Sequence, residues 1–284
     1  MSNRPTSDES LTKFNEAFSS IEQIRGKPNK ELDQYFVTKD TSLNRALLVN
    51  PDDYNHKRII TLGDMDLVAL SIGLLSKPRD LAILDIDKRV SEIALNMKID
   101  QNIRSVRFIN HDIRTKMLGI LNNQFDYVFI EPPMTEEGLE VGLSRAVQCA
   151  KKNEPSKIFL SFDIIDEKKH LIEEYFEKMN LTIESVKKSF NVYEHETPLE
   201  KSVSDLYVLA VSEESTETIP HHYFGPTYFR ESYQKPHTYE CKCGEIYSVG
   251  AKGSYSTIVE LKEKGCPKCG YSENFRYTSS IPLE

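Results

Sequence analysis

Two carboxylates lie where a buried strand is predicted to give way to a helix. The apolar run 58–62 ends at Gly63, and Asp64 and Asp66 follow it. In an open α/β sheet, ligands bind in the crevice beyond the carboxyl ends of the strands. This strand end is therefore the likeliest place for chemistry, with Gly63 and Asp64 as candidates to bind a nucleoside cofactor and Asp64 and Asp66 as candidate catalytic acids, although the stretch alone does not decide. The alternative is that Gly63 only makes a turn and an aspartate caps the next helix.

Two further aspartates lie at or just beyond the ends of the next two predicted strands. Asp85 comes about 20 residues after Gly63, the spacing at which an acid binds ribose hydroxyls in nucleoside-binding sheets. We favour ribose binding for Asp85 over a surface position. Asp112 either accepts a hydrogen bond from an adenine amino group or pairs with Arg114, and the residues do not decide between these roles. No second glycine follows closely after Gly63, so a dinucleotide such as NAD is not predicted.

Glu131 ends another predicted strand and precedes two consecutive prolines, Pro132 and Pro133. Prolines cannot continue the hydrogen-bonded ladder, and they keep the backbone extended and stiff. Glu131 should therefore be held at the carboxyl edge of the sheet, where a carboxylate can orient an amine and accept its proton. We predict that Glu131 is catalytic. A Pro-Pro turn with an incidental glutamate is the weaker alternative.

Four of the five cysteines form two pairs near the C-terminus, Cys241 with Cys243 and Cys266 with Cys269, and each pair is followed by glycine. Two such pairs favour zinc over disulfides. Four thiolates complete a closed tetrahedral site, so we predict a structural Zn²⁺ in a zinc ribbon, with rubredoxin-like iron as the alternative. Cys149 lies on an apolar helix face and is predicted to be a core thiol.

The elements that must position these residues alternate between short apolar runs and helical patterns. The runs are 58–62, 81–85, 105–109, 125–130 and 157–162, and the helical stretches are 66–76, 87–98, 136–151 and 167–179. This alternation predicts a parallel, doubly wound α/β sheet. Two more runs, 181–190 and 205–212, have no helix between them and predict a terminal hairpin. The order resembles the class I methyltransferase-like fold.

The chain divides into four predicted parts. Residues 1–31 form a polar N-terminal arm with an apolar pattern typical of one amphipathic helix. Residues 32–213 form the Rossmann-like domain, and residues 214–238 form a linker whose aromatic residues indicate that it packs on that domain. Residues 239–284 form the zinc ribbon, which is a second, small domain.

Composition and charge limit the classes of partner. The formal net charge of −8 argues against broad binding to a phosphate backbone and suits a cationic ligand. No run of 18 apolar residues is present, and the N-terminus has no apolar signal-peptide core. We therefore expect a cytoplasmic protein with no membrane partner.

Together these motifs resemble those of the branched-chain polyamine synthases of archaea and bacteria, over roughly residues 32–212. The resemblance rests on Leu32-Asp33-Gln34, Val37-Thr38, Arg45, Leu62-Gly63-Asp64-Met65-Asp66-Leu67, Leu84-Asp85-Ile86-Asp87, His111-Asp112-Ile113-Arg114 and Glu131-Pro132-Pro133. It implies an aminopropyltransferase that moves an aminopropyl group from decarboxylated S-adenosylmethionine to spermidine. Two residues depart from the family pattern: Met65 replaces the middle one of three aspartates, and Glu131 replaces the aspartate of Asp-Pro-Pro.

The charges of such a reaction suggest a role for each acid. A sulfonium makes its attached carbon electrophilic, so the enzyme mainly needs a deprotonated amine in line with it. A carboxylate must hold the amine and take its proton. We place Glu131 and Asp66 near the acceptor amine and Asp64 near the donor's sulfonium or aminopropyl arm.

Two other functions stay open at this stage, an S-adenosylmethionine-dependent N-methyltransferase and a non-catalytic nucleoside- or amine-binding protein. The carboxylates of Asp64 and Asp66 would repel the carboxylate of S-adenosylmethionine, and this repulsion favours the decarboxylated donor. The ribbon is left with three roles: nucleic-acid binding, homodimer formation, or cover for the active site. The positive charges of its lysines are balanced by the negative charges of its glutamates, and a ribbon without excess positive charge is not expected to bind nucleic acid.

Overall fold

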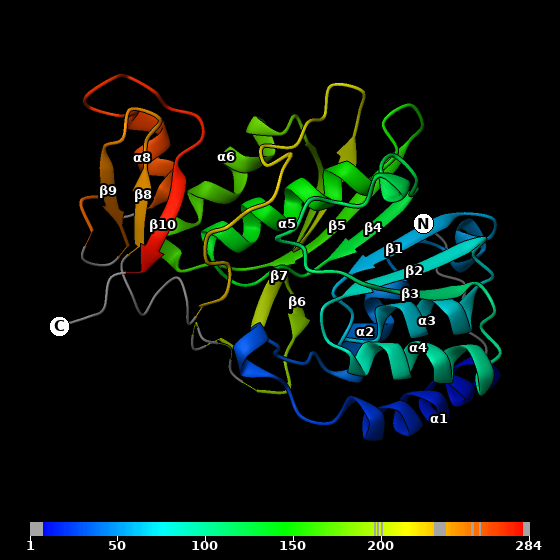
Figure 1. The fold of residues 1–284 in the computed structure, drawn as a ribbon. Helices are drawn as coiled ribbons and strands as arrows, with labels where there is room; N and C mark the ends of the chain where they lie inside the picture. Colours follow the sequence, from blue (N-terminus) through cyan, green and yellow to red (C-terminus); the bar gives the residue numbers. More distant parts are fainter. Residues whose placement is uncertain are drawn as a thin grey trace.

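The computed structural model describes residues 8–195, 197, 199, 201–229, 237–250, 253–255 and 257–280 of the 284-residue chain. These residues build a seven-stranded sheet covered by helices and a separate three-stranded sheet (Figure 1). No helix within them is both long enough and apolar enough to cross a membrane.

The large sheet has the strand order β3-β2-β1-β4-β5-β7-β6. Its strands are β1 (Arg58–Leu62), β2 (Asp80–Asp85), β3 (Val106–Asn110), β4 (Tyr127–Ile130), β5 (Ser156–Phe162), β6 (Thr182–Val192) and β7 (Val203–Val211). The first five strands are parallel, and β7 runs antiparallel to β5 and β6. The predicted class I methyltransferase-like sheet with a terminal hairpin is therefore confirmed.

Helices cover both faces of this sheet (Figure 1). On one face lie α1 (Asp8–Arg25), α2 (Lys39–Ala46), α3 (Val68–Leu75) and α4 (Arg89–Ile99), and on the other lie α5 (Glu136–Cys149) and α6 (His170–Lys178). Short 3₁₀ helices occupy Lys30–Leu32, Pro51–Tyr54, Gly119–Leu121 and Asp166–Lys168. Successive strand residues point to opposite faces, so Ile59 packs in the cluster of α1, α3 and α4, and Ile60 packs in the cluster of α5 and α6. The strands are buried on both faces because both faces carry helices.

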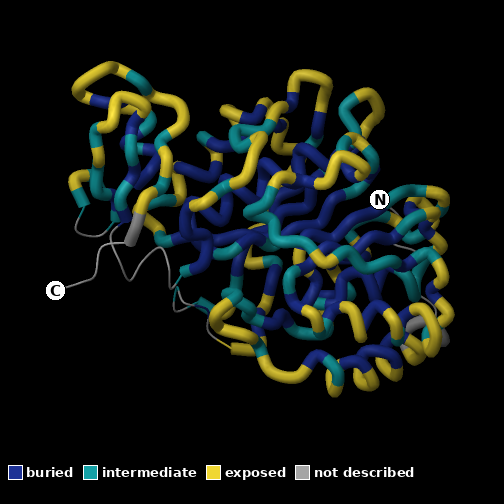
Figure 2. Tube along the Cα trace, viewed as in Figure 1, coloured by how far each residue is buried: buried dark blue, intermediate teal, exposed yellow. Residues whose placement is uncertain are grey.

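The N-terminal segment contains the helix that the apolar pattern of residues 1–31 indicated, and this helix, α1, packs on the sheet domain. Phe14, Phe18 and Ile21 of α1 are buried in the same hydrophobic cluster as α3 and α4. Figure 2 shows the outer side of α1 exposed and its inner side buried. The segment from Asp8 onward is thus structurally part of the sheet domain.

The order of the chain reverses between β1 and β4, which are neighbours in the sheet. Gly63 follows β1 with φ +80°, a conformation that costs glycine little and other residues more. Its N–H donates to the carbonyl of Leu84 at the end of β2 (2.8 Å). The carboxyl ends of β1, β2 and β4 therefore meet at one edge, where such folds bind ligands.

The C-terminal module contains β8 (His237–Glu240), β9 (Ile246–Val249), β10 (Arg276–Ser280) and α8 (Ile258–Lys264), with the sheet order β10-β8-β9. Its own small core includes Tyr239, Val249, Ile258 and Leu261. Val259 instead packs in the cluster of α5 and α6, so the ribbon is attached to that face of the main domain.

The described part of the linker lies against α5. Arg145 of α5 is fully buried, and it donates to the carbonyls of Ile219 (2.6 Å) and His221 (2.7 Å) in the linker. It also donates to the carbonyl of Ile113 in the loop after β3 (2.7 Å). One buried side chain thereby fixes the linker and a loop at the carboxyl edge of the sheet to the same helix. Residues 230–236 of the predicted linker lie outside the described residues.

Candidate active site and metal centre

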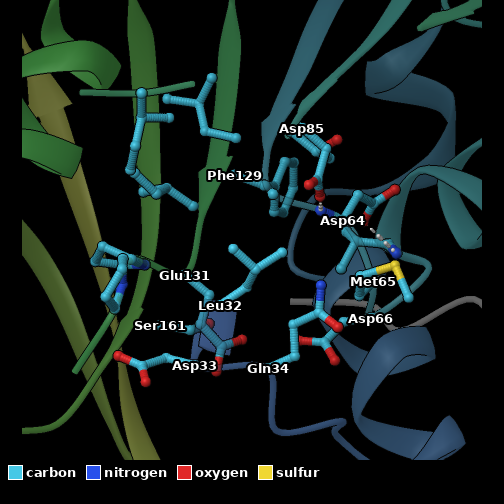
Figure 3. A pocket seen from close by; sticks show the side chains of 18 of the residues that line it. Leu32, Asp33, Gln34, Asp64, Met65, Asp66, Asp85, Phe129, Glu131 and Ser161 are labelled. Carbon is cyan, nitrogen blue, oxygen red and sulfur yellow. Dashed lines mark hydrogen bonds between the residues drawn. The ribbon is translucent and has the colours of Figure 1, made fainter. Parts of the chain in front are cut away.

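A cavity lies at the carboxyl ends of β1, β2, β4 and β5, with about 1050 Å³ of empty space including its open mouth. In Figure 3, Asp64, Met65, Asp66 and Asp85 lie on one side, and Glu131 and Ser161 lie on the other. Apolar and aromatic residues fill much of the wall: Leu32, Tyr35, Phe36, Leu62, Met65, Val68, Leu84, Ile86, Ile113, Phe129, Ile130, Met134, Phe159 and Tyr228. An apolar cavity with a few polar groups is typical of a small-molecule site.

Asp64 lines the cavity but also caps the following helix. Its Oδ1 accepts from the N–H of Val68 (2.8 Å) and its Oδ2 from the N–H of Ala69 (3.1 Å). Burial raises the pKa of Asp64 well above its ordinary value, although these two hydrogen bonds oppose the shift. The capping role that the sequence left open is therefore observed, and a role toward the donor stays a prediction.

Asp85 lines the cavity at the end of β2, and its role as a ribose ligand stays a prediction. Its Oδ2 accepts from the N–H of Asp64 (3.1 Å) and its Oδ1 from the N–H of Asp87 (2.8 Å), and the residue lines the cavity. Burial raises the pKa of Asp85 to about 6. A carboxylate oxygen can accept more than one hydrogen bond, so both oxygens keep capacity for hydroxyls.

Asp112 lies outside the lining of this cavity. Arg114 binds its carboxylate through Nε and Nη2, with Nη2 at 2.7 Å from Oδ2, and lowers the pKa of Asp112 against the effect of burial. The pairing with Arg114 is thus the alternative that the structure favours. The neighbouring His111 lines the cavity instead, with Nε2 2.9 Å from the Thr115 hydroxyl. Burial lowers the pKa of His111, which favours its neutral form.

Asp66 and Glu131 meet at one arginine, Arg45 of α2. The guanidinium donates Nη1 to Asp66 (2.8 Å) and Nη2 to Glu131 (2.6 Å). Asp66 also accepts from the N–H of Val37 (3.0 Å), and Glu131 also accepts from the hydroxyl of Tyr193 (2.5 Å). Burial raises the pKa of Glu131 to about 8, although Arg45 acts in the opposite direction. Two of the three acids predicted to be catalytic, Asp66 and Glu131, therefore lie together in the cavity.

The hairpin of β6 and β7 supports this group, and the motifs did not identify its residues. Asn191 accepts from Nε of Arg45 (2.8 Å) and donates to the hydroxyl of Ser204 (3.0 Å). The Tyr193 hydroxyl lies 2.9 Å from the same hydroxyl. These residues come more than 140 positions after Arg45, and no local pattern connects them with it.

The end of the linker forms part of the cavity wall. Tyr228 is buried and lines the cavity, and the guanidinium of Arg114 lies 5.4 Å from the centre of its ring. The N–H of Phe229 donates to the carboxylate of Asp33, another lining residue. Among the described residues, none of the ribbon's own residues lines the cavity, so the ribbon does not form its cover there.

The four paired cysteines converge in the ribbon. The Sγ atoms of Cys241, Cys243, Cys266 and Cys269 all lie within 4.8 Å of one another. The separations are 3.5 Å between Cys241 and Cys269 and 3.6 Å between Cys243 and Cys266. A tetrahedral zinc with bonds of about 2.3 Å requires sulfur atoms about 3.8 Å apart, so the thiols fit that ion. Cys149 is fully buried in the main core, as predicted.

The doubly wound sheet, with an acid-containing cavity at its switch point, defines a domain with the class I methyltransferase-like fold. The chain belongs to the branched-chain polyamine synthase family, because residues 13–243 match its branched-chain polyamine synthase A C-terminal domain. The family indicated by the sequence motifs is thereby confirmed.

Individual relatives of this chain share only 25–31% sequence identity with it. An uncharacterised protein of Methanocaldococcus jannaschii is 31% identical over 164 residues, which is 57% of this chain and 41% of that protein. N(4)-bis(aminopropyl)spermidine synthase of the same organism is 25% identical over 207 residues, 68% of this chain and 59% of that protein. The chain thus spans about half the length of these relatives.

A solved structure shares the fold. The branched-chain polyamine synthase of Thermus thermophilus, in complex with N4-aminopropylspermidine and 5′-methylthioadenosine, superimposes with a TM-score of 0.67 at 18% identity. The match covers 77% of this chain and 69% of that chain.

Proposed function

We propose that this chain transfers an aminopropyl group from decarboxylated S-adenosylmethionine to an amine of a spermidine-like polyamine. The observation that carries the proposal is that Asp66 and Glu131 lie in the same cavity as Asp85. One cavity then offers a ribose anchor and a carboxylate pair for an amine. The names of the synthase relatives and the ligands of the solved family structure support the same reaction.

The proposed reaction needs few protein groups. Asp85 holds the ribose of the donor, and the acceptor nitrogen lies beside Glu131 and Asp66. The nitrogen forms a bond to the aminopropyl carbon, the carbon–sulfur bond breaks, and its electron pair leaves with sulfur as methylthioadenosine. The proton of the amine passes to the Glu131 carboxylate. Correct orientation of the two reactants supplies much of the rate enhancement.

The basic residues of the cavity favour the decarboxylated donor over S-adenosylmethionine. Within the described lining, Arg45 is the one arginine or lysine, and its donors already bind Asp66, Glu131 and Asn191. A methionine carboxylate would therefore meet acids and no available cation. Such a buried, unpaired charge is costly.

Mass spectrometry tests the proposal. The protein is incubated with each donor and a panel of amines, and methylthioadenosine and S-adenosylhomocysteine are both measured. We expect methylthioadenosine with the decarboxylated donor and a triamine. If S-adenosylhomocysteine is the product, the chain is an N-methyltransferase, and if neither product forms with any amine, the proposed activity is wrong.

The variant Glu131→Gln tests the base. It keeps the shape of the side chain but removes the proton acceptor, so kcat should fall by about 10²–10⁴-fold. The control is Glu184→Gln, on the exposed strand β6, which should leave kcat unchanged. An unchanged rate in Glu131→Gln removes this residue from the mechanism.

We further infer that Cys241, Cys243, Cys266 and Cys269 hold a structural zinc, supported by the distances between their sulfur atoms. Four thiolate ligands leave no open coordination position, so the ion stabilises the ribbon and takes no part in the reaction. Paired thiols without disulfides are typical of a reducing compartment, which supports a cytoplasmic location.

A further inference from the structure

Arg45 is fixed by hydrogen bonds from all three of its side-chain nitrogens at the Asp66–Glu131 side of the cavity. Its side chain is 4% exposed, and each of its three nitrogen atoms donates to a different residue. The partners come from the loop after β1 (Asp66), the end of β4 (Glu131) and strand β6 (Asn191). Removal of this side chain would remove the group that contacts all three elements at once.

The charges of this group explain why a cation is needed there. Two buried carboxylates close together do not both ionise, because each disfavours the charge of the other. Arg45 donates to both carboxylates and lowers the pKa of Glu131, so it favours the charged form of that residue. The other groups that face the pair are the Tyr193 hydroxyl, which donates to Glu131, and Asp64, whose carboxylate caps α3.

We propose that Arg45 is a positioning residue that keeps Asp66 and Glu131 together as a single proton-accepting pair. This inference rests on the proposed function for its role in turnover. A base works best when its pKa lies near the working pH. Burial raises the pKa of Glu131, Arg45 lowers it, and the balance leaves it at about 8. Without Arg45 the pKa of Glu131 rises further, so at a given pH a smaller fraction of Glu131 is ionised and able to take the proton of the amine.

Three variants test this role. Arg45→Met removes the charge at similar length, and Arg45→Lys keeps the charge but not the three-way contact. Arg58→Met removes a comparable arginine, paired with Asp80 at the opposite edge of the sheet (3.1 Å), and is the control. The measurement is the pH dependence of kcat/KM for methylthioadenosine formation.

We expect the acidic limb of the profile to move up by at least about one pH unit in Arg45→Met, a tenfold loss of activity on that limb at a given pH. Arg45→Lys should restore most of this shift, and Arg58→Met should show none. A merely structural role for Arg45 would lower the rate at every pH without moving the limb, and that result would overturn the proposal.

A second measurement does not depend on activity. Carbon-13 NMR of the glutamate carboxyl groups, with the Glu131 signal identified by its absence in Glu131→Gln, gives the protonation midpoint directly. The midpoint should be higher in Arg45→Met than in the parent chain, and an unchanged midpoint would contradict the inference even if the chain is an active aminopropyltransferase. A shifted midpoint in a chain that forms no product would instead contradict the proposed function alone.

If circular dichroism shows that Arg45→Met does not fold, Tyr193→Phe takes its place in the NMR experiment. It removes one hydrogen-bond donor to Glu131 and keeps the ring in its buried position. The midpoint of Glu131 should then rise above that of the parent chain, and no rise would contradict the paired-base assignment.

Discussion

The N–H of Val259, at the start of α8 in the ribbon, donates a 3.2 Å hydrogen bond to the carboxylate of Glu136, in the first turn of α5. Lys262 of α8 pairs with Glu140 of α5 (3.1 Å). The side chain of Val259 joins the core of the main domain. Because α5 begins shortly after Glu131 and its two prolines, the ribbon is attached to the helix that follows the candidate base.

Removal of the metal should therefore destabilise more than the ribbon. Metal analysis should find one zinc per chain, and Cys269→Ser should lose it, because the remaining three thiolates do not close the site. Loss of about 2–3 kcal/mol at the interface with α5 would lower the melting temperature of a domain this size by roughly 5–10 °C. Differential scanning calorimetry measures this change.

The control is Cys149→Ala, which changes a buried thiol of the main core and should leave the zinc content at one. If Cys269→Ser still binds one zinc per chain, the four-cysteine site is wrong. If it loses zinc but melts at the parent temperature, the ribbon does not support the main domain.

The two aspartates proposed for the nucleoside should behave differently. Asp85→Asn should weaken binding of methylthioadenosine by about 10–100-fold, because hydrogen bonds to a charged group contribute about 1.5–3 kcal/mol. Asp112→Asn should leave the affinity almost unchanged, since Asp112 pairs with Arg114 outside the cavity lining. Isothermal titration calorimetry measures both, and equal losses would place Asp112 back in the site.

The fold was predictable because its signals are local. Each strand of the parallel sheet is a short apolar run, and the hairpin lacks a helix, so the fold class follows from the pattern alone. The burial of α1 was not predictable in the same way. Its apolar residues are visible in the sequence, but their partners on α3 and α4 lie more than 40 residues away.

The sequence predicts those residues of the site whose positions are set by the ends of the strands. Asp66, Asp85 and Glu131 follow strands whose ends meet at one edge, and they line one cavity. Asp112, two residues beyond the end of β3, pairs with Arg114 and lies outside the lining, whereas His111 is a lining residue. Arg45 was visible as part of a motif, but its role depends on Asn191 and on the carboxylates that it joins.

Stability should fall as the pH rises through the range in which Glu137 ionises. Burial raises the pKa of Glu137 to about 7, from an ordinary value of 4.5. Between these values the folded chain holds a proton that the unfolded chain has lost, so the free energy of unfolding decreases with pH. Above about pH 7 the loss is complete.

The variant Glu137→Gln removes this ionisation. Between pH 5 and pH 8 the parent chain should lose about 1–3 kcal/mol more free energy of unfolding than the variant does. Urea denaturation at the two pH values measures the difference, with Glu177→Gln on the exposed side of α6 as the control. Parallel pH dependence in the parent and in Glu137→Gln would show that Glu137 is ionised in the folded chain at pH 5.

Met65 should limit the charge of the acceptor that the cavity prefers. Its side chain is 6% exposed and lines the cavity between Asp64 and Asp66, where the family pattern has an aspartate. Met65→Asp adds a negative charge at this position. A cation at 4 Å gains about 4 kcal/mol at an effective dielectric constant of 20, and part of this is lost to the desolvation of the new acid. We therefore expect KM for spermidine to fall by roughly tenfold, an energy of about 1.4 kcal/mol.

The comparison with Met65→Leu separates charge from shape, because leucine keeps an apolar side chain of similar volume. Spermidine and butylamine, which carries a single amine, are assayed with both variants and with the parent chain. The ratio of kcat/KM for spermidine to that for butylamine should rise in Met65→Asp and stay constant in Met65→Leu. A ratio that rises equally in both variants would mean that Met65 acts through the size of its side chain, and a ratio that changes in neither would place the acceptor away from Met65.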